Sequence, residues 1–209
     1  VNTDGYANAV MGTGTIRRDR SASTYATGGA LLDQVTLESL YMGDGFARRI
    51  VDIVANDATR AGFDVDGIDE SQEDKLESAL EALSVNKHIK SALTWSRLYG
   101  GSLMILGVND GGSLEDELNL DTARDFEFIR VYDRYQATVH VRNTDPASEQ
   151  YGQPELWLIS PTLTGTMPYK VHNSRCIILD GAALPDRQRS ANENWGASCL
   201  QACTDQLTR

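Results

Sequence analysis

The sequence has few cysteines, no long apolar run and a shortage of basic side chains, and each shortage excludes a class of protein. Its three cysteines, Cys176, Cys199 and Cys203, form no C-x-x-C pair and leave an odd count, so reduced thiols are expected and a disulfide framework is excluded. No apolar run approaches the roughly 18 residues of a membrane-spanning helix, and no signal peptide opens the sequence. We therefore expect no membrane partner.

Basic residues are outnumbered, with 19 Lys and Arg against 30 Asp and Glu and a net charge of −11. Binding of nucleic acid across a broad basic face is excluded, because such binding depends on neutralising phosphates. One small cluster, Arg17, Arg18 and Arg20, is a candidate phosphate contact. The alternative is a solvated patch that neighbouring acids bring close to neutral.

With 209 residues, of which 41% are hydrophobic, the chain can form one substantial domain, or a domain and an arm. Residues 1–35 are rich in Gly, Ser, Thr and Ala and lack apolar periodicity, which predicts an extended arm that becomes ordered on a partner surface. The domain is then expected over residues 36–209. It ends in a helical pattern, 197–209, that is still running at Arg209, which indicates a fragment. The arm's candidate subunit contacts are Tyr6, Val10, Met11, Ile16 and Tyr25.

The first half of the domain predicts helices. Thr36 is the expected N-cap of a short first turn, Asp44 caps the next helix, and Asn86 caps a later one. Between them, the acidic segment 64–81 has no basic partner in sequence, so we expect it to face solvent. The second helix carries an apolar stripe that we assign to the core: Ala47, Ile50, Val51, Val54 and Ala58.

The stretch Ser91–Val108 organises the rest of the chain. Its pattern predicts a helix that stops at Gly100–Gly101, followed by a strand buried on both faces. Five short β-like runs follow at 126–131, 137–141, 155–159, 169–172 and 175–179. The fold class is therefore α+β, with N-terminal helices on a mostly antiparallel sheet of short strands. Asn173–Ser174 is a candidate tight turn between the last two strands.

No complete catalytic, cofactor or metal site is evident. Cys199 and Cys203, four residues apart, form at most half of a zinc site, with Cys176 and His172 as the only further ligands nearby in sequence, so small buried thiols are preferred. His172-Asn173-Ser174 matches one of the two His-x-Ser/Thr motifs of a two-histidine phosphoesterase. The other histidines, His88 and His140, lack the motif, so we expect a structural histidine and no enzymatic activity.

A series of short matches, in order along most of the chain, resembles the N-terminal portion of tailed-bacteriophage portal proteins. It includes Trp95-Ser96-Arg97-Leu98-Tyr99-Gly100-Gly101-Ser102 as its strongest segment. The other segments are Asp4–Asn8, Leu40-Tyr41, Ala47–Asp52, Asn56–Phe63, Val131–Arg134, Tyr169–Arg175, Leu184-Pro185 and Asn194–Ser198.

The resemblance implies a structural subunit of the head–tail connector, mainly its wing. Such subunits form a ring, commonly of twelve copies, at one capsid vertex of the virion, after assembly in the host cytoplasm. Double-stranded DNA passes through the ring during packaging and ejection, and the major capsid protein, terminase and head-completion or neck proteins are the implied partners. A net acidic chain is compatible with a DNA conduit, because like charges lower adhesion.

Two alternatives remain open. Some proteins with a similar N-terminal region are associated with cleavage of cyclic-nucleotide immune signals, which implies a two-histidine phosphodiesterase. A monomeric adaptor associated with the capsid is the other alternative. A ring, or its absence, in the natural protein would separate the portal from the adaptor.

Overall fold

The computed structural model describes residues 31–62, 70–163 and 165–204. The chain divides into two compact units, Val1–Leu32 and Asp33–Arg209, and nearly all described residues belong to the second. The boundary at residues 35 and 36 stays a prediction. Within the described ranges, no helix combines the length and the apolar character needed to cross a membrane.

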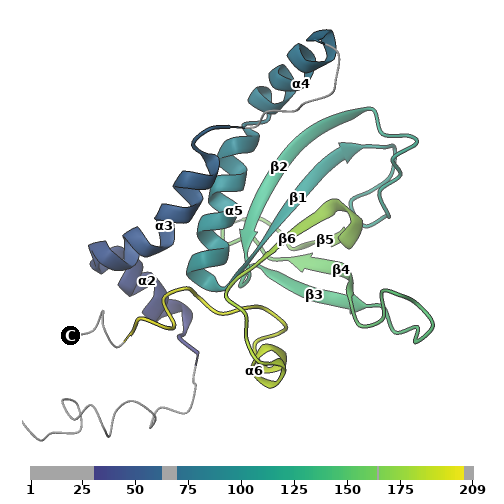
Figure 1. Cartoon of the computed structure of the whole chain (residues 1–209). Helices are drawn as coiled ribbons and strands as arrows, with labels where there is room; N and C mark the ends of the chain where they lie inside the picture. The colour runs from purple at the N-terminus through teal and green to yellow at the C-terminus, as the bar shows by residue number, and fades with distance from the viewer. Residues whose placement is uncertain (1–30, 63–69, 164, 205–209) are drawn as a thin grey trace, which may run out of the picture. The chain divides into compact units, whose positions relative to one another are not determined.

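The second unit has a helical layer and two three-stranded sheets, which confirms the α+β fold class (Figure 1). Every strand pairing is antiparallel. The long helices are α2 (Gln34–Gly43), α3 (Gly45–Thr59), α4 (Glu70–Ala82) and α5 (Val85–Tyr99). The first sheet has the order β2 (Asp125–Asp133), β1 (Gly101–Asn109), β6 (Cys176–Asp180), and the second the order β3 (Ala137–Arg142), β4 (Pro154–Ile159), β5 (Tyr169–His172). The short helices are η1 (Asn173–Arg175) and α6 (Asp186–Ala191).

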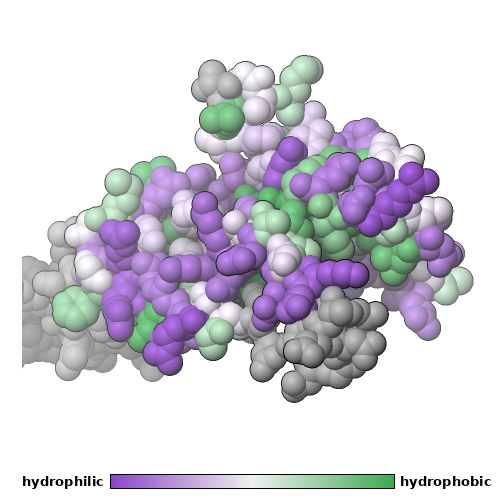
Figure 2. All heavy atoms as spheres, turned by 90° about the horizontal axis from the view of Figure 1, so that it is seen from above, coloured by the Kyte–Doolittle hydropathy of each residue, from purple (hydrophilic) through white to green (hydrophobic). Residues whose placement is uncertain are grey.

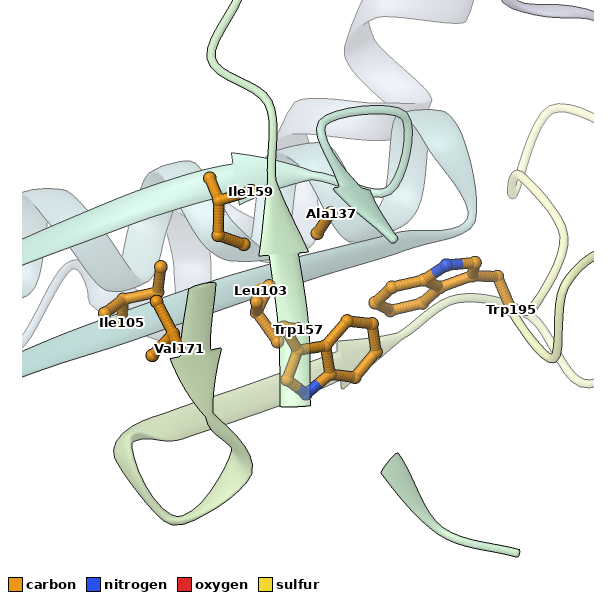
Figure 3. Packing of buried hydrophobic residues seen from close by; sticks show 7 residues of the cluster. All are labelled: Leu103, Ile105, Ala137, Trp157, Ile159, Val171 and Trp195. Atoms are coloured by element: carbon orange, nitrogen blue, oxygen red, sulfur yellow. The ribbon is translucent and has the colours of Figure 1, made fainter. Parts of the chain in front are cut away.

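Strand β1 lies at the centre of the first sheet and is buried on both faces, as its continuous apolar run predicts. On one face, the Ser102 hydroxyl donates to the Ala92 carbonyl of α5 at 2.7 Å. On the other face, Leu103 and Ile105 join a core cluster with residues of the second sheet (Figure 3). The cluster is completed by Ala137, Trp157, Ile159, Val171 and Trp195.

The α5–β1 junction confirms the predicted helix stop at two glycines. Gly100 adopts the left-handed conformation, with φ of 90°, and its N–H donates to the Ser96 carbonyl. A Cβ atom on Gly100 would lie 2.4 Å from the Gly196 carbonyl oxygen, and one on Gly101 would lie 2.2 Å from Cε3 of Trp195. Both positions therefore require glycine, Gly100 for conformation and space and Gly101 for space alone.

Of three predicted helix caps, two differ from the structure and one is confirmed. Asp33, one helical turn before the expected start, caps α2 by accepting from the Thr36 N–H at 2.8 Å. Asn86 does not cap α5; its side chain donates to the Thr59 carbonyl and links α5 to the end of α3. The Asp44 cap of α3 is confirmed, since its carboxylate accepts from the N–H groups of Phe46 and Ala47.

Two predictions about the C-terminal region are wrong in part. Asn173–Ser174 does not close a hairpin, because β5 and β6 belong to different sheets and η1 carries the chain from one to the other. The helix expected over residues 197–209 is replaced across residues 199–203 by turns, in which Gln201 and Cys203 donate to carbonyls three residues back. Residues 205–209 of that prediction lie outside the described ranges.

Candidate functional site

The His-x-Ser motif is the one catalytic pattern that the sequence offered, and the structure places it at the turn between β5 and η1. His172 is the N-cap of η1, where its Nδ1 accepts from the Ser174 N–H at 3.2 Å. The Ser174 hydroxyl also lies 2.8 Å from Nδ1 and accepts from the Leu118 N–H at 2.8 Å. Because Nδ1 acts as an acceptor, the neutral ring carries its proton on Nε2.

No second histidine completes a two-histidine site in the part of the chain that the structure describes. His140 lies on β3, at the register irregularity between Val139 and Val141. Strand β4 separates it from β5, so the two histidines are on strands roughly 10 Å apart. His88 lies on α5, in the helical layer, where burial lowers its pKa. The structural role of His172 stays a prediction.

A buried ion pair next to this turn was not predicted from the sequence. Arg175 donates through Nη2 to Asp110 at 2.6 Å, and the two side chains are 1% and 2% exposed. Its other nitrogens donate to the carbonyls of Asp116 and Val108. The N–H of Asn119, the Arg175 guanidinium and the N–H of Gly112 together lower the pKa of Asp110 to about 2. The pair thus fixes the 110–119 loop against the His172 turn.

The three cysteines form neither a disulfide nor a metal cluster among the described residues. All three thiols are partly buried, and burial raises the pKa of Cys176 to about 12 and also raises that of Cys199. This protonated, unreactive state agrees with the preferred interpretation of small buried thiols.

A pocket of about 360 Å³ lies between β3, β4, the end of β6 and the segment that contains and follows α6. It is lined by Arg142, Arg189, Asp180 and the buried Trp157 and Trp195, among others. Its arginines already have partners: Arg142 donates to the Gly152 carbonyl and Arg189 pairs with Asp180. The charge of Arg189 is thus neutralised, whereas a carbonyl does not neutralise the charge of Arg142. One partly exposed cation does not define a site, and we assign none to this pocket.

The helical layer exposes large apolar side chains. Met42 at the end of α2 is 85% exposed, and Phe46 in the first turn of α3 is 79% exposed. The stripe assigned to the core from sequence is correct for Ala47 and Val51, whereas Val54 is 46% exposed and Ala58 is also exposed. Figure 2 shows that hydrophilic residues cover most of the face in view, with hydrophobic residues between them. The exposed helices are thus candidates for contact with another molecule.

The residues named from sequence as phosphate or subunit contacts lie outside the described ranges. They are Arg17, Arg18 and Arg20 for phosphate and Tyr6, Val10, Met11, Ile16 and Tyr25 for the subunit contact. These assignments stay predictions.

The central stretch, the α+β fold and the exposed helices agree with one family. Residues 35–209 match phage portal proteins. The chain belongs to the phage portal protein family. This confirms the resemblance drawn from the segments around Trp95–Ser102.

Two curated relatives match the chain over nearly all of its length. One, from Caulobacter sp. (strain RHG1), is 30% identical over 98% of this chain and is named anti-CBASS protein Acb1. Another with the same name, from Sphingomonas paeninsulae, is 29% identical over 98% of this chain. In each case the match covers 32% of the relative, so the chain spans about a third of the length of these proteins.

These relatives correct one expectation. The sequence predicted a structural protein without enzymatic activity, and that prediction is wrong, because the matching curated proteins are named for an anti-CBASS role and not for a structural part alone. The absence of a second His-x-Ser motif in this chain does not exclude enzymatic activity, because the chain matches only a third of each relative.

Proposed function

We propose that this chain is the portal-type part of a protein that combines ring assembly with anti-CBASS enzymatic activity. The observation that carries the proposal is the double match: residues 35–209 belong to the portal family, and 98% of the chain aligns with proteins named anti-CBASS. The two roles are compatible, because assembly uses surfaces of this fold whereas catalysis requires a separate set of side chains.

In the assembly role, the chain is a subunit of a ring of twelve copies at the capsid vertex of a virion. Double-stranded DNA passes through the ring, and the major capsid protein, terminase and neck proteins bind around it. The exposed apolar side chains of α2 and α3 support a role in assembly, since they have no cover within the described chain. The arm residues Tyr6, Val10, Met11, Ile16 and Tyr25 are proposed to contact a neighbouring subunit.

In the enzymatic role, the protein is a phosphodiesterase of the two-histidine type that opens a cyclic nucleotide signal. Water is added across one phosphodiester bond, which leaves a linear nucleotide with a terminal phosphate. We assign His172 a structural role in this enzyme, because Nδ1 is engaged with Ser174 and the Ser174 hydroxyl with the Leu118 N–H, which leaves only Nε2 of the ring for another contact. Catalysis of this type needs an available acid, an available base and a hydroxyl that can reach the phosphate.

The test uses the natural protein that carries this chain. Purified protein is incubated with cyclic di- and trinucleotides, products are separated by anion-exchange chromatography, and particle mass is measured by mass photometry. We expect linear products and particles of about twelve subunits. Rings without hydrolysis would remove the enzymatic half of the proposal, and hydrolysis by a monomer would remove the assembly half.

A further inference from the structure

Helix α3 is apolar over more of its circumference than its own chain covers. Its buried face consists of Ala47, Val51, Ala55 and Thr59, which pack within the described unit. The opposite face carries Phe46 and Ile53, and Val54 lies between the two faces; all three side chains are exposed. A surface helix normally has one apolar stripe, and a helix with a much wider apolar arc is normally buried. This helix is therefore half covered in a single copy.

The last turn of α2 adds the exposed Met42, which lies four residues before Phe46 on the other side of the Asp44 cap. Together with Arg49, these side chains define what we call the α3 surface: Met42, Phe46, Arg49, Ile53 and Val54. Single exposed apolar residues are common in soluble proteins. Four within 13 residues, on two consecutive helices, indicate a contact with another molecule.

Helix α3 and its cap are less acidic than the chain as a whole, since Asp44 makes the stretch from Met42 to Arg60 neutral. The segment from Gly45 to Arg60 has three arginines (Arg48, Arg49, Arg60) and two aspartates (Asp52, Asp57), although the whole chain has a net charge of −11. Arg48 pairs with Asp52 on its own helix. Exposed Arg49 lies beside Phe46 and Ile53, and exposed Asp57 lies on the other side of the same strip. The α3 surface is thus an apolar strip with one basic border, and that border favours an acidic partner.

The same chain carries such a partner in α4. This helix extends beyond the N-terminal end of α5, away from the two sheets (Figure 1). Its exposed acids include Asp74, Glu77 and Glu81, while Leu76 and Leu80 are only half-buried. From sequence we expected this acidic segment to face solvent because it had no basic partner. The α3 surface supplies one.

We propose that the α3 surface binds helix α4 of a second copy of this chain. Because the two surfaces differ, every copy presents one of each, and the contact is head-to-tail. A head-to-tail contact generates a ring when its rotation closes, so this inference deepens the proposed assembly role and rests on it. The arm is a weaker candidate for the same surface, since its Arg17, Arg18 and Arg20 cluster does not complement a basic border.

The first experiment tests the α3 surface in the natural protein. Phe46→Glu is compared with Leu120→Glu, which changes an equally exposed leucine, 77% against 79%, in the loop between β1 and β2. We expect Phe46→Glu to weaken oligomer formation at least tenfold in sedimentation, and Leu120→Glu to leave it unchanged. Circular dichroism confirms that both variants are folded. Equal effects of the two substitutions would show that the α3 surface is not the contact.

The second experiment tests the occupant by charge exchange. Arg49→Glu and Glu77→Arg are each expected to weaken the oligomer, and the double variant is expected to recover most of it, since opposite charges face each other again. No recovery in the double variant would overturn α4 as the partner. In that case, loss of the oligomer on deletion of residues 1–30 would identify the arm as the occupant.

The outcomes also separate this inference from the proposed function. If the unmodified protein forms rings and every α3 and α4 variant keeps them, the contact is wrong and the assembly role stands. If the unmodified protein remains a monomer at all concentrations, the assembly role is wrong and the contact falls with it. Nucleotide hydrolysis, measured in parallel, reports on the enzymatic role alone.

Discussion

The two sheets and the helical layer of this chain differ in how far they bury their large apolar side chains. Between the sheets, Leu103, Ile105, Trp157, Ile159 and Val171 are at most 3% exposed, and the Trp157 and Trp195 rings lie 5.5 Å apart (Figure 3). On the helices, large side chains such as Met42 and Phe46 are almost fully exposed. The core between the sheets is therefore complete within one copy, although strands β2 and β6 also expose Phe126, Ile177 and Ile178. The helical layer is complete only when another molecule covers it.

The difference follows from how each region closes. At the C-terminal end of α5, glycines allow backbones to approach closely, so that the 195–197 segment seals the core at Trp195. On the outer side of α3, no element covers the helix within the described residues. Burial of a large apolar side chain contributes about 1.5–3 kcal/mol relative to exposure. The core side chains contribute this energy to folding, and we expect the exposed ones to contribute it to assembly.

The largest predicted loss of stability is at Gly100. Substitution by Ala imposes a positive φ on a side chain and places Cβ 2.4 Å from a backbone oxygen that cannot rotate away. We expect the free energy of unfolding to fall by at least about 3 kcal/mol, the range of large mutational effects. Denaturant titration measures it.

Two other glycines serve as controls that separate the effect of backbone conformation from the effect of close contact. Gly111 has φ of 85° with open space around it, and Gly45 has neither a positive φ nor a neighbour within 4 Å. Gly111→Ala should cost about 1 kcal/mol through conformation alone, and Gly45→Ala should be close to neutral. If Gly100→Ala costs no more than Gly111→Ala, the close approach of Gly196 does not hold the junction.

The next largest effect is at the buried ion pair. Arg175→Met leaves the Asp110 carboxylate without its cation and removes the Arg175 hydrogen bonds to the carbonyls of Asp116 and Val108. Removing one partner of a buried pair costs about 3 kcal/mol. The exposed pair gives the control, since Arg189→Met should cost less than about 1 kcal/mol. Equal losses of stability in the two variants would show that burial does not increase the contribution of Arg175.

The same pair predicts how stability depends on acid. The pKa of Asp110 is lowered from 3.8 to about 2, so its ionised form stabilises the fold above pH 4, and that contribution is lost as the pH falls from 4 to 2. Asp110→Asn removes the titrating group. We therefore expect the stability of the variant to change less steeply with pH across this window. Urea titrations at pH 4, 3 and 2.5 measure the free energy of unfolding of both proteins. If it falls equally steeply with pH in the unmodified protein and in Asp110→Asn, Asp110 is not the origin of the acid dependence.

Much of the fold could be predicted because it depends on local patterns. The Gly100–Gly101 stop, the buried run of β1 and the Asp44 cap are each encoded within a few residues, and all are confirmed. The separation of β5 from β6 could not be predicted, because the partner of a strand is set by contacts between distant parts of the chain and not by the strand's own sequence. Thr36 and Asn86 failed as caps because better positioned neighbours or other contacts were available.

The candidate site was harder to predict for the same reason. Arg175 and Asp110 are 65 residues apart and meet only through the fold, so neither has a local signature. The exposure of Val54 and Ala58 was also missed, since an apolar stripe looks the same whether its own chain or another chain covers it. The width of the apolar arc on α3 was the signal available, because Phe46 and Ile53 lie outside the assigned stripe.

The smallest predicted effect concerns His172 and separates its structural role from a catalytic one. As the N-cap of η1, it should stabilise the fold by about 1 kcal/mol, the usual contribution of a side-chain cap. His172→Ala should therefore lower stability by that amount and leave nucleotide hydrolysis by the natural protein within about twofold, because the residue acts only through the turn. His140→Ala is the matched control, since His140 is exposed on β3 and has no capping role. His172→Asn sharpens the test, because an Asn side chain can accept from the Ser174 N–H but cannot transfer a proton at neutral pH. Loss of hydrolysis in both His172 variants, with normal stability in His172→Asn, would make His172 part of the catalytic site.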